Sequence, residues 1–294
     1  MSFSVGIVGL PNVGKSTLFK ALTRIPVDIA PYPFTTIHPN VGVIAVPDER
    51  LQKVAEIIKP EKITPTIIEF VDIAGLVKGA HKGEGLGNQF LAQIRNCDAI
   101  LEVVRAFEGK DVENVTGKID PQSDIETVKI EFEMKDLESK EKENLLSKKP
   151  VIYLLNTDGK AQFQMPKSDY LTLNLKEEAD ISELSPEERK ELGVESKLDQ
   201  LIIACYNILD LITFYTVAGL KETRAWTLKR GLAAPDAGGV VHSDFKTKFI
   251  RAEAIPWQKL VEAGNWHKSR ELGWLKTVGR DYIVQDGDVM EFKI

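Results

Sequence analysis

Residues 9–16 (GLPNVGKS) near the start of the chain match the phosphate-binding pattern G-x-x-x-x-G-K-S in full. The β-branched run at residues 5–8 precedes this loop, and residues 15–23 carry apolar side chains at helical spacing. A strand, a glycine loop and a helix in this order are the setting that the pattern requires. The loop therefore commits the first part of the chain to an α/β fold with a phosphate site. The alternative is a glycine turn before a purely structural helix.

The residue types in this loop suit phosphate chemistry. Glycines let backbone N–H groups close around phosphates at the start of a helix. We expect Lys15 to reach the β- and γ-phosphates and Ser16 to ligate Mg²⁺. The chain is thus predicted to bind a nucleoside triphosphate with Mg²⁺ and to hydrolyse it.

Segments of strand and helix character alternate up to about residue 173, which predicts a mostly parallel sheet with helical crossovers. At the end of the third predicted strand lies Asp72-Ile73-Ala74-Gly75. We expect Asp72 to hold Mg²⁺ through a water molecule and the Gly75 N–H to sense the γ-phosphate. Between the two motifs, Thr35 or Thr36 could supply a hydroxyl to Mg²⁺, and spacing alone leaves this choice open.

Two positions depart from a typical GTPase. Leu76 follows Gly75, where many GTPases place a glutamine that orients the attacking water. The segment Asn156-Thr157-Asp158-Gly159 stands where they carry Asn-Lys-x-Asp, whose aspartate accepts two guanine N–H bonds. Because Gly159 lacks a carboxylate, guanine selectivity is expected to be lost unless Asp158 takes that role. A plain turn at Asn156 is the alternative.

Composition limits the partners. The net charge of −6 argues against a nucleic-acid coat, no apolar run is long enough to span a bilayer, and Cys97 and Cys205 lack metal-ligand spacing. We therefore expect a cytoplasmic protein that contacts neither a membrane nor a specific DNA sequence. Residues 213–294 carry 13 Lys and Arg against 10 Asp and Glu, while the remainder carries 25 against 34. A basic tail suits an anionic partner, unless the unevenness is chance.

Past residue 193 the pattern changes to short strands. Residues 281–284 and 289–292 are predicted strands that flank a hairpin turn at residues 285–288. One helix is expected among these strands, beginning near Pro256 and ending at Gly264. The region is therefore predicted to be a small α+β domain that folds alone.

Several of these segments together resemble the YchF family, the Obg-like ATPases of the TRAFAC class of P-loop GTPases. The match includes residues 9–19, 32–42, 69–87 (EFVDIAGLVKGAHKGEGLG) and 219–227 (GLKETRAWT). The last two segments are the most specific, and the resemblance covers most of the chain.

The resemblance implies an architecture in three parts. Residues 1–135 and 150–211 would form a Ras-like P-loop domain (OBG-type G domain) with a mostly parallel α/β sheet. Residues 136–149 would be a truncated remnant of the coiled-coil insertion that family members carry. Residues 212–294 would be a TGS domain with a β-grasp, ubiquitin-like α+β fold.

The resemblance also implies activity and partners. Family members hydrolyse ATP in preference to GTP and bind ribosomes, mainly the large subunit. It selects Thr36 over Thr35, so that Ser16, Thr36 and Asp72 would hold Mg²⁺ while Lys15, Thr36 and Gly75 would serve hydrolysis. Asn156 would contact the base. The phosphate-holding residues carried over by motif are Asn12, Val13, Gly14, Lys15, Ser16 and Thr17.

Departures from the family pattern leave the catalytic group open. Many members place a histidine where this chain has Asn114, and Gly159 ends the base-reading motif. A nucleotide-gated ribosome- or RNA-binding protein with negligible hydrolysis is therefore the alternative function. A K⁺ ion coordinated by Asn12 could replace the missing groups, because several TRAFAC GTPases without the glutamine use this asparagine. Candidate ribosome contacts in the tail are Lys246, Lys248, Arg251 and Arg280.

Overall fold

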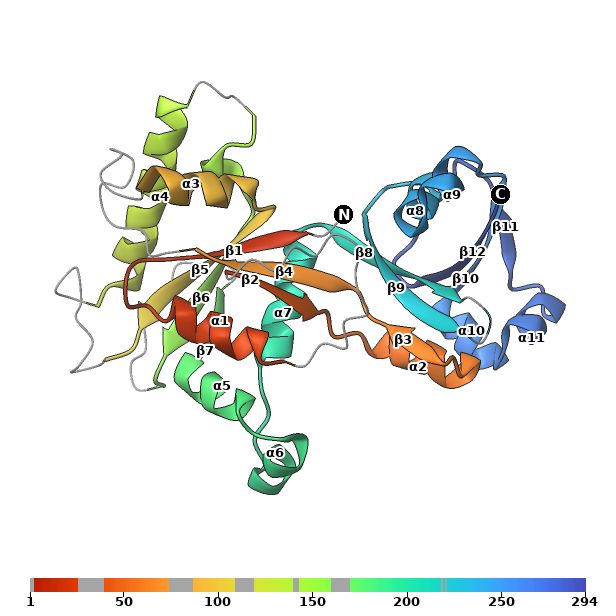
Figure 1. The fold of residues 1–294 in the computed structure, drawn as a ribbon, viewed down its shortest axis with the longest axis horizontal. Coiled ribbons are helices and arrows are strands. Elements are labelled where there is room, and N and C mark those ends of the chain that lie inside the picture. Colours follow the sequence, from red (N-terminus) through yellow and green to blue (C-terminus); the bar gives the residue numbers. More distant parts are fainter. Residues whose placement is uncertain are drawn as a thin grey trace.

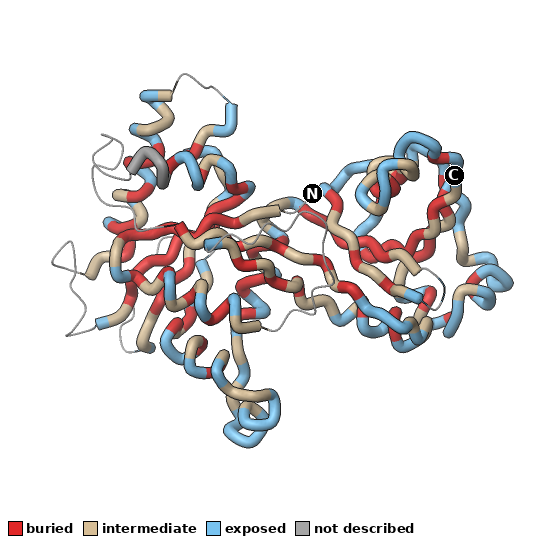
Figure 2. Tube along the Cα trace, in the orientation of Figure 1, coloured by how far each residue is buried: buried red, intermediate tan, exposed pale blue. Residues whose placement is uncertain are grey.

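A computed structural model describes residues 3–25, 40–73, 87–108, 119–139, 143–159, 170–217, 219 and 221–294, without the side chains of residues 87–90. The described chain forms two six-stranded sheets, each covered by helices (Figure 1). Buried segments run along the middle of both sheets, and exposed residues lie on the outer helices (Figure 2). The expected pairing of an α/β domain with a smaller α+β domain is confirmed.

The first sheet is parallel except where β2 runs antiparallel to β4. Its central strands β1 and β5 are buried almost throughout, as expected for parallel strands covered on both faces. In spatial order the strands are β2 (Val41–Ala45), β4 (Ile67–Asp72), β1 (Ser4–Val8), β5 (Ala99–Ala106), β6 (Val151–Thr157) and β7 (Tyr170–Leu173).

Helices cover both faces of this sheet. In the view of Figure 1, α3 and α4 lie above it, while α1, α5 and α7 lie below. Helix α1 buries Leu18, Ala21 and Leu22, which recur at the spacing of one helical face. The helices are α1 (Lys15–Thr23), α3 (Gly87–Asn96), α4 (Pro121–Glu138), α5 (Leu175–Ser182), α6 (Pro186–Leu192) and α7 (Leu198–Ile208).

The segment expected to be a truncated insertion, residues 136–149, begins inside α4 and ends in a single 3₁₀ turn, η2 (Leu146–Lys148). The Asp136 carboxylate accepts hydrogen bonds from the backbone N–H groups of Leu146 (3.0 Å) and Ser147 (2.8 Å). These bonds hold the turn against the end of α4. In the described part of the chain this segment is therefore a short connection rather than a separate arm.

The second sheet carries helices on both faces, and its strands alternate between two apolar layers. Along β8, Ile212 and Phe214 face the layer with α8, whereas Tyr215 faces the layer with α10. In spatial order the strands are β11 (Lys276–Val278), β10 (Arg251–Pro256), β12 (Asp288–Lys293), β8 (Leu211–Val217), β9 (Glu222–Lys229) and β3 (Lys62–Thr64). The C-terminal helices are α8 (Ala234–Val241), α9 (Ser243–Thr247), α10 (Trp257–Ala263) and α11 (Trp266–Glu271).

A segment from the first half of the sequence belongs to this second sheet. Strand β3 pairs in parallel with β9, and helix α2 (Glu49–Ile58) buries Leu51 and Val54 against Tyr215 and Ala225. An excised fragment of residues 212–294 would expose these apolar surfaces. The core of the C-terminal region therefore includes residues distant in sequence, and independent folding of this region stays a prediction.

Two expectations for the C-terminal region are wrong. Residues 281–284 form no strand, and only Ile283 makes an isolated bridge, to Ala233. Strand β12 therefore has no hairpin partner before it and pairs instead with β10 and β8. The expectation of a single helix in this region missed α8, α9 and α11. Helix α10 begins after Pro256 and ends at Gly264, as expected.

Candidate functional site

The phosphate loop follows β1 at the carboxyl edge of the parallel sheet. Its backbone takes left-handed or otherwise positive φ angles at Gly9 (144°), Asn12 (62°) and Gly14 (108°). A Cβ atom at Gly9 would lie 2.3 Å from the Val103 carbonyl oxygen, and one at Gly14 would lie 2.6 Å from the Asn156 amide nitrogen. Both glycines are therefore required by close packing as well as by backbone conformation.

Lys15 folds back over the loop. Its ammonium group donates hydrogen bonds to the carbonyl oxygens of Gly9 (3.0 Å) and Leu10 (2.7 Å), and the residue is 7% exposed. Burial lowers the pKa of Lys15 to about 8, although the nearby Asp72 carboxylate opposes this shift. A buried ammonium held by carbonyl groups at a helix start is placed to meet an anion that would compensate its lost hydration.

The first turn of α1 offers backbone donors. Gly14 is the N-cap and supplies no side-chain cap, and the first backbone bond onto the cap runs from Leu18 N to Gly14 O at 3.0 Å. The N–H groups of residues 15–17 therefore have no intrahelical acceptor. Together with the positive end of the helix dipole, they form an anion site of the kind that binds phosphate. Val13 is buried beneath the loop, and Thr17 is half-buried.

Ser16 and Asp72 meet from two different elements. The Ser16 hydroxyl donates to Asp72 Oδ2 at 3.5 Å, at the point where β4 ends beside α1. Burial raises the pKa of Asp72, while the Lys15 charge and the Ser16 hydrogen bond oppose that rise. A hydroxyl and a carboxylate are the oxygen ligands that Mg²⁺ prefers, so these two residues fit the ion predicted for the site.

Several predicted residues lie outside the described part of the chain. They include Thr36 and Gly75, which were expected to contact Mg²⁺ and the γ-phosphate. The alternative Thr35, and Leu76 and Asn114, which bear on catalysis, lie there as well. Their predicted roles remain predictions.

Asn156 lies behind the phosphate loop and is 7% exposed. Its amide nitrogen donates to the Val13 carbonyl oxygen at 2.9 Å, and its amide oxygen accepts from the Leu175 backbone N–H at 3.1 Å. The side chain therefore ties the loop to the first residue of α5. This bracing role was missed from the sequence because it depends on where α5 packs. The only signal was the position of Asn156 at the end of a buried strand.

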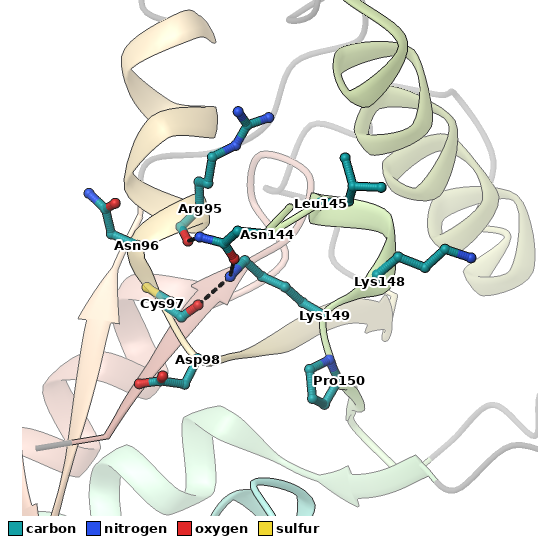
Figure 3. A pocket seen from close by; sticks show the side chains of 9 residues that line it. All are labelled: Arg95, Asn96, Cys97, Asp98, Asn144, Leu145, Lys148, Lys149 and Pro150. Carbon is teal, nitrogen blue, oxygen red and sulfur yellow. Dashed lines mark hydrogen bonds between the residues drawn. The ribbon is translucent and has the colours of Figure 1, made fainter. Parts of the chain in front are cut away.

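A separate polar cavity of about 320 Å³ lies at the opposite edge of the first sheet, where β5 and β6 begin (Figure 3). Its polar groups bind one another. Lys149 Nζ donates to Cys97 O (2.5 Å) and Asn144 Oδ1 (2.8 Å), and Asn144 Nδ2 donates to Arg95 O (2.9 Å). Because ligands of open α/β sheets bind at the carboxyl ends of the strands, this cavity is not the nucleotide site.

The described residues contain neither a metal-binding cluster nor a membrane-spanning helix. No group of three or more His, Cys, Asp or Glu side chains comes together there as a metal centre. None of the described helices combines the length and the apolar character needed to cross a bilayer.

Two family models match this chain. Residues 4–157 match MMR_HSR1, described as a 50S ribosome-binding GTPase. Residues 211–294 match YchF-GTPase_C, described as a protein of unknown function.

Relatives match over the whole chain. The ribosome-binding ATPase YchF of Bacillus subtilis is 40% identical, with 100% of this chain and 99% of the relative covered. That of Haemophilus influenzae is 42% identical with the same coverage. The Bacillus alignment spans 364 positions, 70 more than the 294 residues of this chain, so the relative carries additional internal residues. The solved structure of the Schizosaccharomyces pombe YchF GTPase superposes with a TM-score of 0.85 at 31% identity, covering 99% of this chain and 98% of that one.

Proposed function

The chain belongs to the YchF family, and from this membership we propose that it hydrolyses ATP with Mg²⁺ while it associates with the large ribosomal subunit. It is a ribosome-associated, nucleotide-binding P-loop hydrolase. A cytoplasmic location follows from the proposed partner.

The single observation that carries the proposal is the convergence of Lys15, Ser16 and Asp72 at the start of α1. Lys15 and the free N–H groups of the first turn would hold the phosphates, with Asn12, Val13, Gly14 and Thr17 shaping the loop. Ser16, Thr36 and Asp72 would hold Mg²⁺. A bound Mg²⁺ supplies neutralisation of charge on the phosphate oxygens.

We propose that the nucleotide site prefers ATP to GTP only weakly. The Asn156 amide is engaged with Val13 and Leu175, and the Thr157 hydroxyl accepts from the Gly159 N–H at 3.1 Å. These bonds support a turn at residues 157–159 without a carboxylate at Gly159. A guanine-reading site rejects adenine because mismatched polar groups are left unpaired. Without that carboxylate, we propose that ATP binds at least as well as GTP.

Hydrolysis would depend on Lys15 and on Thr36 and the Gly75 N–H, with K⁺ beside Asn12 as a second ion. Asn12 is an exposed residue of the phosphate loop, which supports an ion contact. A cation there would neutralise charge that develops between the β- and γ-phosphates.

The ribosomal contact is proposed for the C-terminal domain. Lys246, Lys248, Arg251 and Arg280 are the candidate contacts for RNA phosphates or ribosomal protein. Arg280 has a second role, because it donates to the Phe249 carbonyl oxygen at 2.7 Å and stacks on that ring. The remaining three cations are therefore better suited to a docking surface.

Steady-state phosphate release with ATP and with GTP, each with and without purified large subunits, tests the proposal. We expect release from ATP to exceed that from GTP and to rise when large subunits are added. Binding to large subunits without measurable release under any condition would support the alternative, a nucleotide-gated ribosome- or RNA-binding protein. A hundredfold preference for GTP would contradict the proposed base choice.

A further inference from the structure

We propose that residues 46–66 couple the nucleotide site to the C-terminal sheet, so that Mg²⁺ and nucleotide at Ser16 and Asp72 stabilise β3 and β9 at a distance. The coupling would act through the pairing of β3 and through a polar cluster around Arg50. The inference rests on the proposed function only in requiring that this site binds Mg²⁺ with a nucleotide.

The near end of the link is the ribbon of β2 and β4. These strands pair antiparallel over five residues, from Val41 opposite Val71 to Ala45 opposite Ile67. The Asp72 backbone N–H donates to Asn40 O at 2.9 Å, so the ribbon starts at the candidate Mg²⁺ ligand. A displacement of Asp72 must therefore be shared by both strands.

The far end of the ribbon leads directly into the other half of the molecule. Val46 N donates to Thr66 O at 2.9 Å, which closes the ribbon, and the intervening chain then forms α2 and β3 (Figure 1). Strand β3 continues the second sheet through its register with residues 222–224 of β9. The Thr64 hydroxyl also donates to Glu222 Oε1 at 2.5 Å.

A polar cluster fixes the start of α2 to the same sheet. The Asp48 carboxylate accepts from Arg50 Nε (2.8 Å) and Nη2 (3.0 Å), and from the Tyr215 hydroxyl (2.6 Å). Arg50 Nη1 reaches Asp286 at 2.7 Å, and Asp286 Oδ1 accepts from Thr213 N at 2.9 Å. Arg50 thereby joins α2 to both β8 and the turn before β12. The Asp48 side chain is only 6% exposed, so the charge-assisted bonds that it accepts are shielded from water, whereas Asp286 is 43% exposed.

Apolar packing makes the same connection. Leu51 and Val54 of α2 are 1% and 0% exposed, and they share one core layer with Ile255 and Val289. Residues 46–66 are therefore held at one end by the nucleotide-binding sheet and elsewhere by the C-terminal sheet. Close-packed interiors transmit displacements rather than absorb them, so a constraint at Asp72 biases the position of β3 against β9.

Hydrogen–deuterium exchange of the full chain tests the coupling. Peptides that cover β3 and residues 222–224 are followed with and without Mg²⁺ and a non-hydrolysable ATP analogue at saturating concentration. We expect exchange there to slow by about fivefold or more, the lower end of typical coupling between two sites. Lys15→Ala at the same analogue concentration should lose this change.

A matched pair of variants tests the route. Arg50→Ala removes the bridge from α2 to Asp286, whereas Arg230→Ala removes an exposed ion pair with Asp210 at the far end of β9 (3.0 Å). We expect the analogue to slow exchange in Arg230→Ala as in the natural protein, and by less than half as much in Arg50→Ala. Tyr215→Phe, which deletes only a hydroxyl, should reduce the effect of the analogue by an intermediate amount. It provides a second test of the cluster if Arg50→Ala does not fold.

Parallel titration with a fluorescent ATP analogue separates the two proposals. No nucleotide binding would overturn the proposed function and the coupling together. Binding with unchanged exchange in β3 and β9 would overturn the coupling alone. Equal analogue effects in Arg50→Ala, Tyr215→Phe and Arg230→Ala would also overturn it, because the effect would then bypass the cluster.

Discussion

The two halves of the molecule hold their charged groups in different ways. In the first half, the buried Lys15 and the half-buried Asp72 lie at one edge of a parallel sheet, and burial shifts both pKa values toward the neutral forms. In the second half, several lysines and arginines lie at the surface in ion pairs, such as Lys246 with Asp236 and Arg270 with Glu253. Buried charges interact strongly and at few positions, whereas exposed pairs contribute little each.

Single substitutions should therefore be most informative in the first half of the molecule. Function in the first half should depend on individual groups, because a low dielectric strengthens each contact and leaves no substitute for it. A docking surface in the second half should depend on the sum of many screened contacts. Mutational effects are therefore expected to be large at the phosphate loop and small on the C-terminal domain.

The largest effect is expected for Lys15→Ala. A charge-assisted hydrogen bond contributes about 1.5–3 kcal/mol, so affinity for ATP should fall by about 10- to 150-fold. Titration with a labelled nucleotide measures the loss. Lys20→Ala is the matched control, because Lys20 lies exposed on the same helix and should leave affinity unchanged. Equal affinities of Lys15→Ala and the natural protein would contradict the assignment of the loop.

The lowered pKa of Lys15 predicts opposite pH trends for binding and stability. Between about pH 8 and its unfolded value of 10.5, the native protein has already released a proton that the unfolded chain still holds. The Lys15 contribution to the free energy of unfolding therefore rises with pH across this window. Nucleotide affinity should fall over the same window, because phosphate needs the charged ammonium. Both pH trends should be weaker in Lys15→Ala, with stability measured by denaturant unfolding and affinity measured by nucleotide titration. If stability rose more steeply with pH in Lys15→Ala than in the natural protein, or affinity fell more steeply, the assignment would be contradicted.

The next largest effect is expected for Asn156→Ala, compared with Asn144→Gly, because Asn144 has a φ of 57° that glycine adopts without strain. Each asparagine makes two hydrogen bonds through its amide, but Asn156 braces the phosphate loop while Asn144 lies at the opposite edge of the sheet. Loss of Asn156 leaves buried groups of Val13 and Leu175 unpaired, at about 1–3 kcal/mol each. Nucleotide affinity should drop about tenfold in Asn156→Ala and stay unchanged in Asn144→Gly. Equal losses in the two variants would show a general effect of stability.

The sequence was sufficient for the phosphate loop and for the alternation of strands and helices around it. Local spacing predicted a helix at residues 15–23, which is α1, and Ser16 and Asp72, both assigned to Mg²⁺, are in contact. The function of Asn156 and the pairing of β3 with β9 depend on tertiary packing between distant segments. Strand β3 has only three residues, so periodicity could not identify it. The bridge at Ile283 resembles a strand in sequence because its neighbours are β-branched or aromatic.

A smaller effect is expected for K⁺ at Asn12. Asn12 has a φ of 62°, which alanine adopts with strain and glycine without it, so Asn12→Gly removes the side chain more cleanly than Asn12→Ala. In the natural protein, phosphate release in K⁺ should exceed that in Na⁺ about threefold or more at equal ionic strength, as expected for an ion that neutralises transition-state charge. Asn12→Gly should erase the difference while Mg²⁺-dependent ATP binding survives. Equal rates in both salts in the natural protein would leave Asn12 as a loop residue.

The smallest effects are expected at the surface of the C-terminal domain. Arg251 is a better residue to test there than Arg280, because Arg280 also supports Phe249 and its loss would destabilise the fold. By strand register, Arg251 lies at one end of the second sheet and Arg230 at the other, so the pair gives a matched test of location. If Arg251 contacts an RNA phosphate, Arg251→Gln should lower the slope of log affinity against log salt by about one, and weaken ribosome binding only about two- to fivefold. Arg230→Gln should change neither quantity. Identical salt slopes for the two variants would place the electrostatic contact elsewhere. A loss of ribosome affinity larger than about a hundredfold from Arg251→Gln would contradict the idea that binding at this surface is distributed over many weak contacts.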